Sequence, residues 1–292
     1  MGARQFPQFV NIETTEEFQL NALLTELAFV LFDDTTNAWC KSQHDFLTAL
    51  AQKTQAIPPD FLYMPDTALL GPIFETARFA GDPAVRDLLT GLAAACCHAE
   101  LADSVLPSFA VIASQLSPVD IEILRSYRLK MSVNMMEHRQ EGEMVSLTPT
   151  DAPVMIRQTY PIVNYVLYTA KGERYTVAVD VYGEVPALTD VDLISKSIGN
   201  LSRLGLVTVT FLESMYDDAL YEKFEQNEFC RQLRRFALGH GLGDARLQIG
   251  SHTVITGGYQ RLEIEKGCTR LTEFGMTFVD VCMMEGGHDP QG

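Results

Sequence analysis

The sequence predicts a mainly helical α+β protein, with an N-terminal helical bundle followed by a C-terminal winged-helix-like α/β part. Apolar residues recur at helical spacing through the first third of the chain, whereas Val, Tyr and Thr become frequent in the later segments. A hydrophobic content of 47% with 21% charged residues is typical of a globular protein with a core. We expect a helical domain at residues 1–130, a variable insertion with a loop and a hairpin at 131–189, a winged-helix-like domain at 190–285 and a loose tail at 286–292.

Helix boundaries in the first domain follow from turn and cap residues. Residues 14–53 have the pattern of one or two helices, and the prolines of the segment 57–60 end it. A further helix is expected from about Thr67 to Phe79. Gly81-Asp82-Pro83 then supplies a turn, an N-cap and a proline at the first helical position. Ser117-Pro118 repeats the cap and proline before another helix.

The segment Leu88–Cys97 is apolar on nearly all sides. It falls short of the roughly 18 residues that a membrane-spanning helix needs. Its small residues, among them Gly91, permit close packing against a neighbour. We therefore expect a buried core helix here.

The insertion and the segment after it contain strand and turn signals. Residues 144–160 are rich in Thr, Pro and Asp and are expected to form a loop. Ile162–Leu167 and Tyr175–Tyr182 fit the strands of a hairpin that turns at Lys171-Gly172-Glu173, but a helix through residues 160–170 fits equally well. Asp190 or Asp192 begins a helix that ends at Gly205, and a strand follows.

The last third of the chain has the element order of a winged helix. Residues 216–238 are expected to be helical and charged, and residues 239–243 interrupt them. Leu247–Thr256 and Tyr259–Glu265 are expected to pair as a hairpin around Gly257-Gly258. A closing helix follows, and the helix that begins at Ser117 could serve as the first member of the winged helix.

Two clusters are candidate contact surfaces. The first is a helix face with Lys196, Asn200 and Arg203 at the spacing of a groove-reading helix, for which packing or protein contact is the preferred interpretation. The second is a basic patch of Arg231, Arg234 and Arg235. The preferred interpretation is a solvated face paired with neighbouring glutamates such as Glu225 and Glu228, and the alternative is a phosphate or RNA contact.

Charge disfavours nucleic acid as a partner. The formal net charge is −16, and residues 1–110 alone carry 14 acidic and 5 basic side chains. A surface this acidic repels a phosphate backbone. The chain also lacks the basic amphipathic face that membrane binding usually needs.

No catalytic constellation is visible, so we expect a protein that is not an enzyme and that uses no cofactor or metal. The six histidines match no HExxH spacing, and no G-x-S-x-G elbow is present. Adjacent helical residues point about 100° apart, so Cys96-Cys97-His98 cannot converge on one ion. The six cysteines fit reduced thiols in a cytoplasmic protein.

Two blocks of sequence carry a family resemblance. The first contains LLGPIFETARFAGDPAVRDLLTGLAAACC and LPSFAVIASQLSPVDIEILRSY, and the second contains SIGNLSRLGLV and the closing LTEFGMTFVDVC. These blocks resemble the Abi-alpha family of bacterial proteins, which are named for a proposed link to abortive infection of phage. The resemblance implies an antiphage or toxin-like role and supplies no enzymatic residue.

Three functional hypotheses follow. The preferred one is a non-enzymatic defence component that binds a phage component or a companion defence protein, with residues 131–189 expected to provide the partner-facing surface. The second is a DNA-binding regulator that uses the helix from Lys196 to Arg203. The third is a membrane-acting effector, suggested by the apolar segment Leu88–Cys97.

Overall fold

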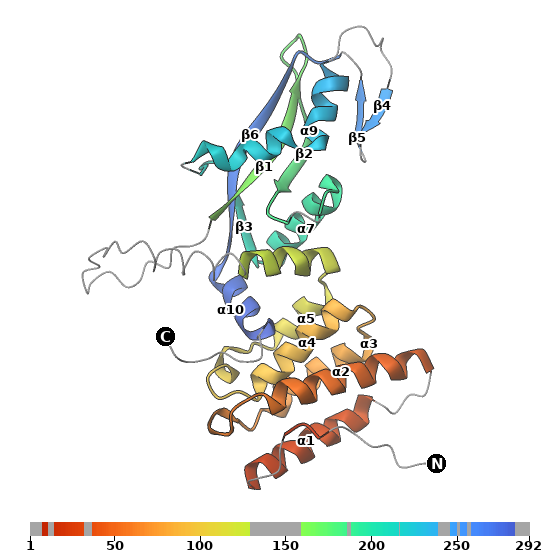
Figure 1. Ribbon diagram of the computed structural model, residues 1–292, viewed down its shortest axis with the longest axis vertical. Coiled ribbons are helices and arrows are strands. Elements are labelled where there is room, and N and C mark those ends of the chain that lie inside the picture. Colours follow the sequence, from red (N-terminus) through yellow and green to blue (C-terminus); the bar gives the residue numbers. More distant parts are fainter. Residues whose placement is uncertain are drawn as a thin grey trace, which may run out of the picture. The chain divides into compact units, whose positions relative to one another are not determined.

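The computed structural model describes residues 8–10, 15–31, 37–128, 159–185, 188–215, 217–238, 246–249, 252–255 and 258–283. The chain divides into two compact units. The first contains Met1–Ile121 and Met276–Gly292, and the second contains Glu122–Gly275. Figure 1 shows helices in the first unit and a curled antiparallel sheet with helices in the second, so the predicted fold class is confirmed.

Helices form the described part of the first unit. A 3₁₀ turn, η1, connects α2 to α3, and another, η2, connects α4 to α5. Asp82 caps α4, since its Oδ1 accepts hydrogen bonds from the backbone N–H groups of Ala84 and Val85 at 2.8 and 3.4 Å. The elements are α1 (Thr15–Leu31), α2 (Asn37–Gln55), η1 (Pro59–Phe61), α3 (Thr67–Phe79), α4 (Pro83–Cys96), η2 (Ala102–Ser104), α5 (Ser108–Ser114) and α10 (Glu273–Cys282), of which residues 276–282 belong to this unit.

Helix α4 is the centre of this unit and packs against α2, α3 and α5. Its residues from Leu88 to Cys96 are all buried, which confirms the prediction of a core helix. A Cβ atom added to Gly91 would lie 2.0 Å from the carbonyl oxygen of Cys282, so only glycine fits there. Within the described residues, no helix has both the length and the hydropathy required to cross a membrane.

A four-stranded antiparallel sheet forms the framework of the second unit. Its strands are β1 (Thr159–Tyr168), β2 (Arg174–Tyr182), β3 (Val207–Thr210) and β6 (Arg261–Leu271), in the order β2-β1-β6-β3. The turn between β1 and β2 has Gly172 at φ +80°, which settles residues 160–182 as a hairpin with its turn where the sequence predicts it. The loop expected at residues 144–160 lies almost entirely outside the described residues.

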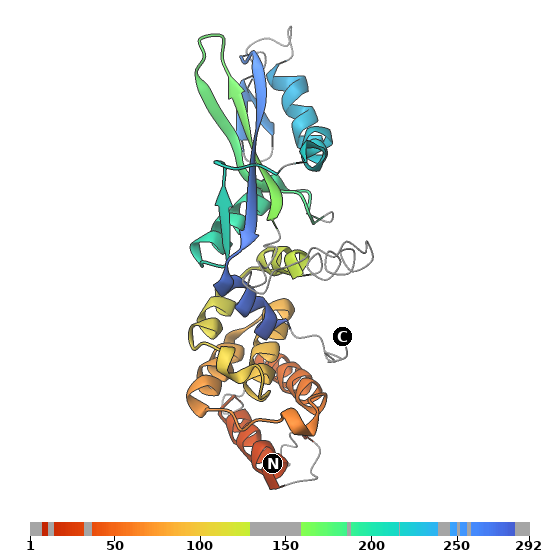
Figure 2. The ribbon, with the colours of Figure 1, turned by 90° about the vertical axis from the view of Figure 1, so that its left-hand side faces the viewer.

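One face of the sheet is covered by helices, which Figure 2 shows beside the strands. The hydrophobic core on this face joins Val163, Tyr165 and Leu167 of β1 to Tyr221 and Phe224. The covering elements are η3 (Asp218–Tyr221), α8 (Glu222–Gln226), α9 (Glu228–Gln232) and η4 (Leu233–Ala237), so the prediction of a helical segment is confirmed over its described residues, 217–238.

Helix α7 (Val191–Arg203) begins and ends as predicted. The Asp190 side chain accepts hydrogen bonds from the N–H groups of Asp192 and Leu193 at 3.0 and 3.2 Å. Gly205 follows the helix with φ +74°, the left-handed conformation that favours glycine at a helix end. The helix at residues 118–128 also has the predicted cap, because Ser117 and Asp120 exchange hydrogen bonds as a capping box does.

The hairpin predicted around Gly257-Gly258 is wrong. Strand β4 (Arg246–Ile249) pairs with β5 (His252–Ile255), and β6 pairs with β1 on one side and β3 on the other. β3 pairs only with Cys268–Leu271 of β6, and β5 belongs with β4 to a separate two-stranded sheet, so the described strands contain no pairing of β5 with β6. The sheet also groups β1 and β2, which we expected in an insertion, with β3 and β6. The tail expected at residues 286–292 lies outside the described residues.

Candidate binding surface

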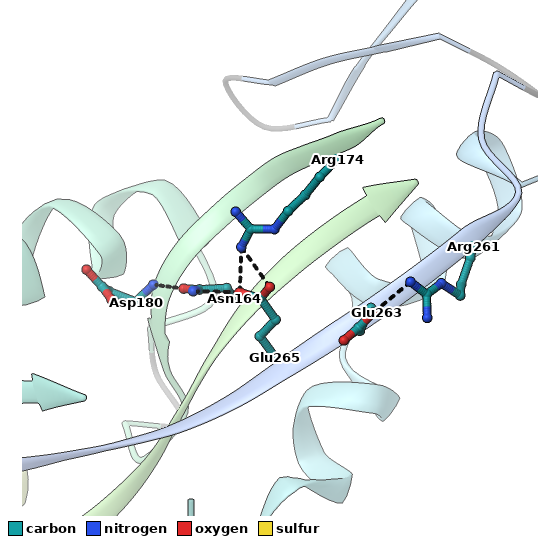
Figure 3. A network of polar contacts seen from close by, with 6 residues as sticks. All are labelled: Asn164, Arg174, Asp180, Arg261, Glu263 and Glu265. Atoms are coloured by element: carbon teal, nitrogen blue, oxygen red, sulfur yellow. Dashed lines mark hydrogen bonds and ion pairs between the residues drawn. The ribbon is translucent and has the colours of Figure 1, made fainter. Parts of the chain in front are cut away.

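Polar side chains from three strands meet on the sheet face opposite α8 and α9. Strand residues alternate between the two faces. Because Val163, Tyr165 and Leu167 point into the helix-covered core, Asn164 and its alternate neighbours point the other way. Figure 3 shows Asn164 of β1, Arg174 of β2 and Glu265 of β6 converging there. Their positions follow from the strand register, which places Asn164 opposite Glu265.

Glu265 is the centre of this polar network. Its two carboxylate oxygens accept hydrogen bonds from Nη2 of Arg174 at 2.7 and 2.8 Å, and Oε2 also accepts from Asn164 Nδ2 at 3.2 Å. Burial acts to raise the pKa of Glu265. The hydrogen bonds from Arg174 and Asn164 and the guanidinium charge outweigh it, so that pKa lies below its usual value. The carboxylate is therefore held ionised in a fixed position.

A backbone irregularity in β2 completes the network. The register between β1 and β2 shifts on both sides of Tyr165, and Asp180 adopts φ +52°. Few residues other than glycine adopt this conformation, and Asp is among those that do. The Asp180 N–H donates a hydrogen bond to Asn164 Oδ1 at 2.9 Å, and burial raises the pKa of the Asp180 carboxyl group. Bulges of this kind often re-aim a side chain beside a functional surface.

A second ion pair extends the same face. Arg261 Nη2 lies 3.1 Å from Glu263 Oε2, and the guanidinium lies 4.2 Å from the centre of the Tyr168 ring. The side chains of Arg261 and Arg174 are 62% and 50% exposed. We call the six residues drawn in Figure 3 the sheet-face network: Asn164, Arg174, Asp180, Arg261, Glu263 and Glu265.

Hydrogen bonds on the helix-covered face anchor β1, the strand that carries Asn164. Tyr165, next to Asn164 in β1, donates a hydrogen bond from its hydroxyl to the carbonyl oxygen of Phe224 at 2.7 Å. The same hydroxyl accepts one from Asn227 Nδ2 at 2.7 Å. Asn227 in turn caps α9 through a hydrogen bond from the Cys230 N–H at 2.7 Å. Strand β1 is thus anchored to the helices directly behind the network.

The residues predicted on α7 are separate from this network. Lys196 and Arg203 are exposed and Asn200 is half-buried. Arg203 Nη2 donates a hydrogen bond to Asn200 Oδ1 at 2.8 Å, so the structure brings these two together. The opposite side of the helix packs inward through Ile198 and Leu201.

The basic patch is paired with acidic side chains. Arg231 Nη2 lies 3.0 Å from Glu228 Oε2, and Arg234 Nη2 lies 3.7 Å from Glu225 Oε2. The guanidinium of Arg235 lies 5.2 Å from the centre of the Phe236 ring. These contacts match the interpretation of a solvated face paired with Glu225 and Glu228.

Lys223 is a functional candidate that the sequence analysis missed. It forms an ion pair with Glu184 beside a cavity of about 200 Å³ whose walls include Val181, Ile194 and Phe229. Burial lowers the pKa of Lys223 to about 8. A sequence signal could not reveal this, because the lowered pKa depends on apolar neighbours from distant segments.

Among the described residues, no three His, Cys, Asp or Glu side chains are grouped as metal ligands. His98 stacks on Phe61 with ring centroids 5.4 Å apart, and burial lowers its pKa. Burial raises the pKa of Cys96 to about 12 and that of Cys97 further. His138 and His240 lie outside the described residues.

The fold and the surface define a mainly helical α+β protein whose sheet carries an ordered set of paired charges. The family model described as Abortive infection alpha matches residues 41–282, most of the chain. The chain therefore belongs to the Abi_alpha family, as its resemblance implied, and the family suggests a defence role of the abortive-infection type. No curated protein and no solved structure matches the chain.

Proposed function

We propose that this protein acts in abortive-infection-type defence by binding a phage component or a companion defence protein, and that it does so without catalysis. The sheet-face network is the observation that supports this proposal. Three of its residues, Asn164, Arg174 and Asp180, belong to the segment 131–189 that we expected to face a partner. Its charges are held in place before any partner arrives, which reduces the side-chain ordering that binding requires.

Arg174 is the residue of the network best suited to contact a partner. Half of its side chain is exposed, and one nitrogen, Nη2, forms both hydrogen bonds to Glu265. Guanidinium groups are enriched at protein interfaces because they combine charge, planarity and several donors. Asn164 and Glu265 act as positioning residues that fix the direction of the guanidinium.

The proposal that catalysis is absent is supported by the state of the thiols. A cysteine attacks as its thiolate, and burial raises the pKa of Cys96, Cys97 and Cys282 far above physiological pH. Lys223 differs, because its pKa of about 8 would suit a general base or an amine nucleophile. The experiment must therefore distinguish a functional role of Lys223 from a functional role of the sheet-face network.

Phage plating on a bacterial host that expresses the protein with its gene neighbours tests the proposal. Arg174→Glu, which opposes Glu265 with a like charge, should abolish protection while the purified variant keeps its circular dichroism spectrum and melting temperature close to wild type. Lys223→Arg retains the ion pair with Glu184 but removes the amine, and it should leave protection intact. Arg231→Glu is the matched control, since it reverses an exposed arginine in an ion pair elsewhere in the unit.

The opposite pattern would contradict the proposal. Protection lost in a folded Lys223→Arg or His98→Ala variant, but kept in Arg174→Glu, would indicate an enzyme. Protection lost in Arg231→Glu alone would indicate that the contact surface is the basic patch of Arg231, Arg234 and Arg235.

A further inference from the structure

A groove with exposed apolar residues lies between α3 and α5 in the first unit. Its volume is about 630 Å³, and the turn that joins α3 to α4 forms one wall. Phe79, the last residue of α3, is 63% exposed, and Val111 of α5 is 54% exposed. Val85 of α4 also lines the groove and is buried. An exposed apolar surface around a hollow is characteristic of an interaction site.

The groove is built on elements that are already fixed. Asp82 caps α4 at the rim, and the buried face of α3, with Ile73 and Phe74, packs in the core. Phe109 of α5 is fully buried and lies edge-on to Phe278, with ring centroids 5.3 Å apart. The hollow therefore exists before an occupant binds, as in complexes in which a helix docks into a preformed groove.

The charged residues that line the groove are both acidic. Glu75 and Asp82 line it, and among the described lining residues none is Lys, Arg or His. Arg78 lies nearby with its guanidinium 5.6 Å from the centre of the Phe79 ring, on the helix that carries Glu75. The surrounding sequence, residues 1–110, carries 14 acidic and 5 basic side chains. Such a surface attracts a cationic partner and repels an anionic one.

We propose that this groove binds an amphipathic helix of a partner protein, with apolar side chains against Phe79 and Val111 and lysine or arginine beside Glu75 and Asp82. The apolar residues supply contact area, and the carboxylates select the sign of the partner's charge. This inference goes beyond the proposed function, because it concerns a different surface in the other unit. It adds a second contact that does not depend on the sheet-face network.

A labelled synthetic peptide tests the proposal with the full-length protein. The probe is a fluorescent peptide of about 16 residues, or four helical turns, with leucines along one face and lysines elsewhere. Fluorescence anisotropy should show binding that weakens as salt rises, because exposed charges are screened. A peptide with glutamates in place of the lysines should bind at least tenfold more weakly. A scrambled peptide of the basic composition, without an apolar face, should also bind at least tenfold more weakly.

Variants of the groove locate the binding. The double change Phe79→Ser with Val111→Ser should raise the Kd for the basic peptide at least tenfold, and Glu75→Lys should raise it about fivefold, as expected for an apolar anchor and a rim charge. Leu212→Ser is the matched control, because Leu212 is 98% exposed and lies in the other unit. Arg174→Glu should bind the peptide as wild type does, which separates this test from that of the proposed function.

Three outcomes would overturn the inference. The first is equal binding of the scrambled and amphipathic peptides, which would indicate only attraction to an acidic protein. The second is an unchanged Kd in both groove variants. The third is a dimer in sedimentation velocity that Glu75→Lys or the double serine variant dissociates, since a second copy would then occupy the groove.

Discussion

Gly91 of α4 and the carbonyl group of Cys282 in α10 leave no space for a side chain between them. A Cβ atom at position 91 would lie 2.0 Å from the Cys282 oxygen and 2.8 Å from its carbonyl carbon, so the backbone itself would have to shift. We expect Gly91→Ala to lower the free energy of unfolding by about 1–3 kcal/mol or more, the usual range for overpacking a core. Urea denaturation followed by circular dichroism measures this change.

Two other helical glycines provide controls for that experiment. A Cβ atom on Gly71 of α3 or Gly199 of α7 would meet nothing within 4 Å. Alanine is favoured over glycine inside a helix by about 0.8–1 kcal/mol, so both substitutions should stabilise the protein slightly. If Gly91→Ala behaved like these two, the close approach of α4 and α10 would be refuted.

A substitution at Leu92 tests whether α4 is buried in the core. Its side chain is fully buried, so Leu92→Asp would place a carboxylate in the core without a partner. We expect a loss of roughly 3–5 kcal/mol in the free energy of unfolding, the cost of an uncompensated buried charge. Leu193→Asp on α7, where the leucine is 46% exposed, should change it by less than about 0.5 kcal/mol. Unchanged melting of Leu92→Asp would contradict the core assignment.

Local signals in the sequence predicted the helix ends but not the strand partners. Asp82, Asp190 and Gly205 act through bonds and backbone angles within a few residues, so their roles are visible in the sequence. Strand β6 pairs with β1, about 100 residues away, and alternation of residues carries no information about which partner a strand selects. The Gly257-Gly258 pair was a strong local hairpin signal, yet β5 pairs with β4, and β6 pairs with β1 and β3.

The sheet-face network was not predictable for the same reason. Arg174 and Glu265 are 91 residues apart, and only the register of β1, β2 and β6 brings them together. By contrast, the pairing of Arg231 and Arg234 with Glu228 and Glu225 is local enough for the sequence to suggest it.

Tyr127 and Thr269 form a buried hydrogen bond between the helix at residues 118–128 and β6. Their hydroxyl oxygens are 2.8 Å apart, and both residues are 1% exposed. Tyr127→Phe should lower the free energy of unfolding by about 1–3 kcal/mol, because it leaves the Thr269 hydroxyl buried without this partner. The double variant with Thr269→Val should lose less than the sum of the single variants. Additive losses would show that the two hydroxyls do not interact.

Duplex DNA should bind weakly or not at all. The net charge of −16 limits counterion release, and Arg203 on α7 already donates a hydrogen bond to Asn200. A gel-shift titration against random and genomic duplexes at physiological salt measures this affinity. Submicromolar binding that disappears in Arg203→Ala would instead support the regulator hypothesis.

The buried thiols of α4 predict how stability depends on pH. Burial raises the pKa of Cys96 from its ordinary 9.0 to about 12, whereas the unfolded thiol ionises near 9.0. Between these values the folded state binds more protons than the unfolded state, so the free energy of unfolding should fall as pH rises above about 9. Cys96→Ala removes this contribution, so its free energy of unfolding should fall less steeply than that of wild type between about pH 8.5 and pH 10.

Urea denaturation of both proteins across that range, with a reductant present, measures the two slopes. Equal slopes would mean that the Cys96 thiol ionises as readily in the folded protein as in the unfolded chain, which its burial against α10 should prevent.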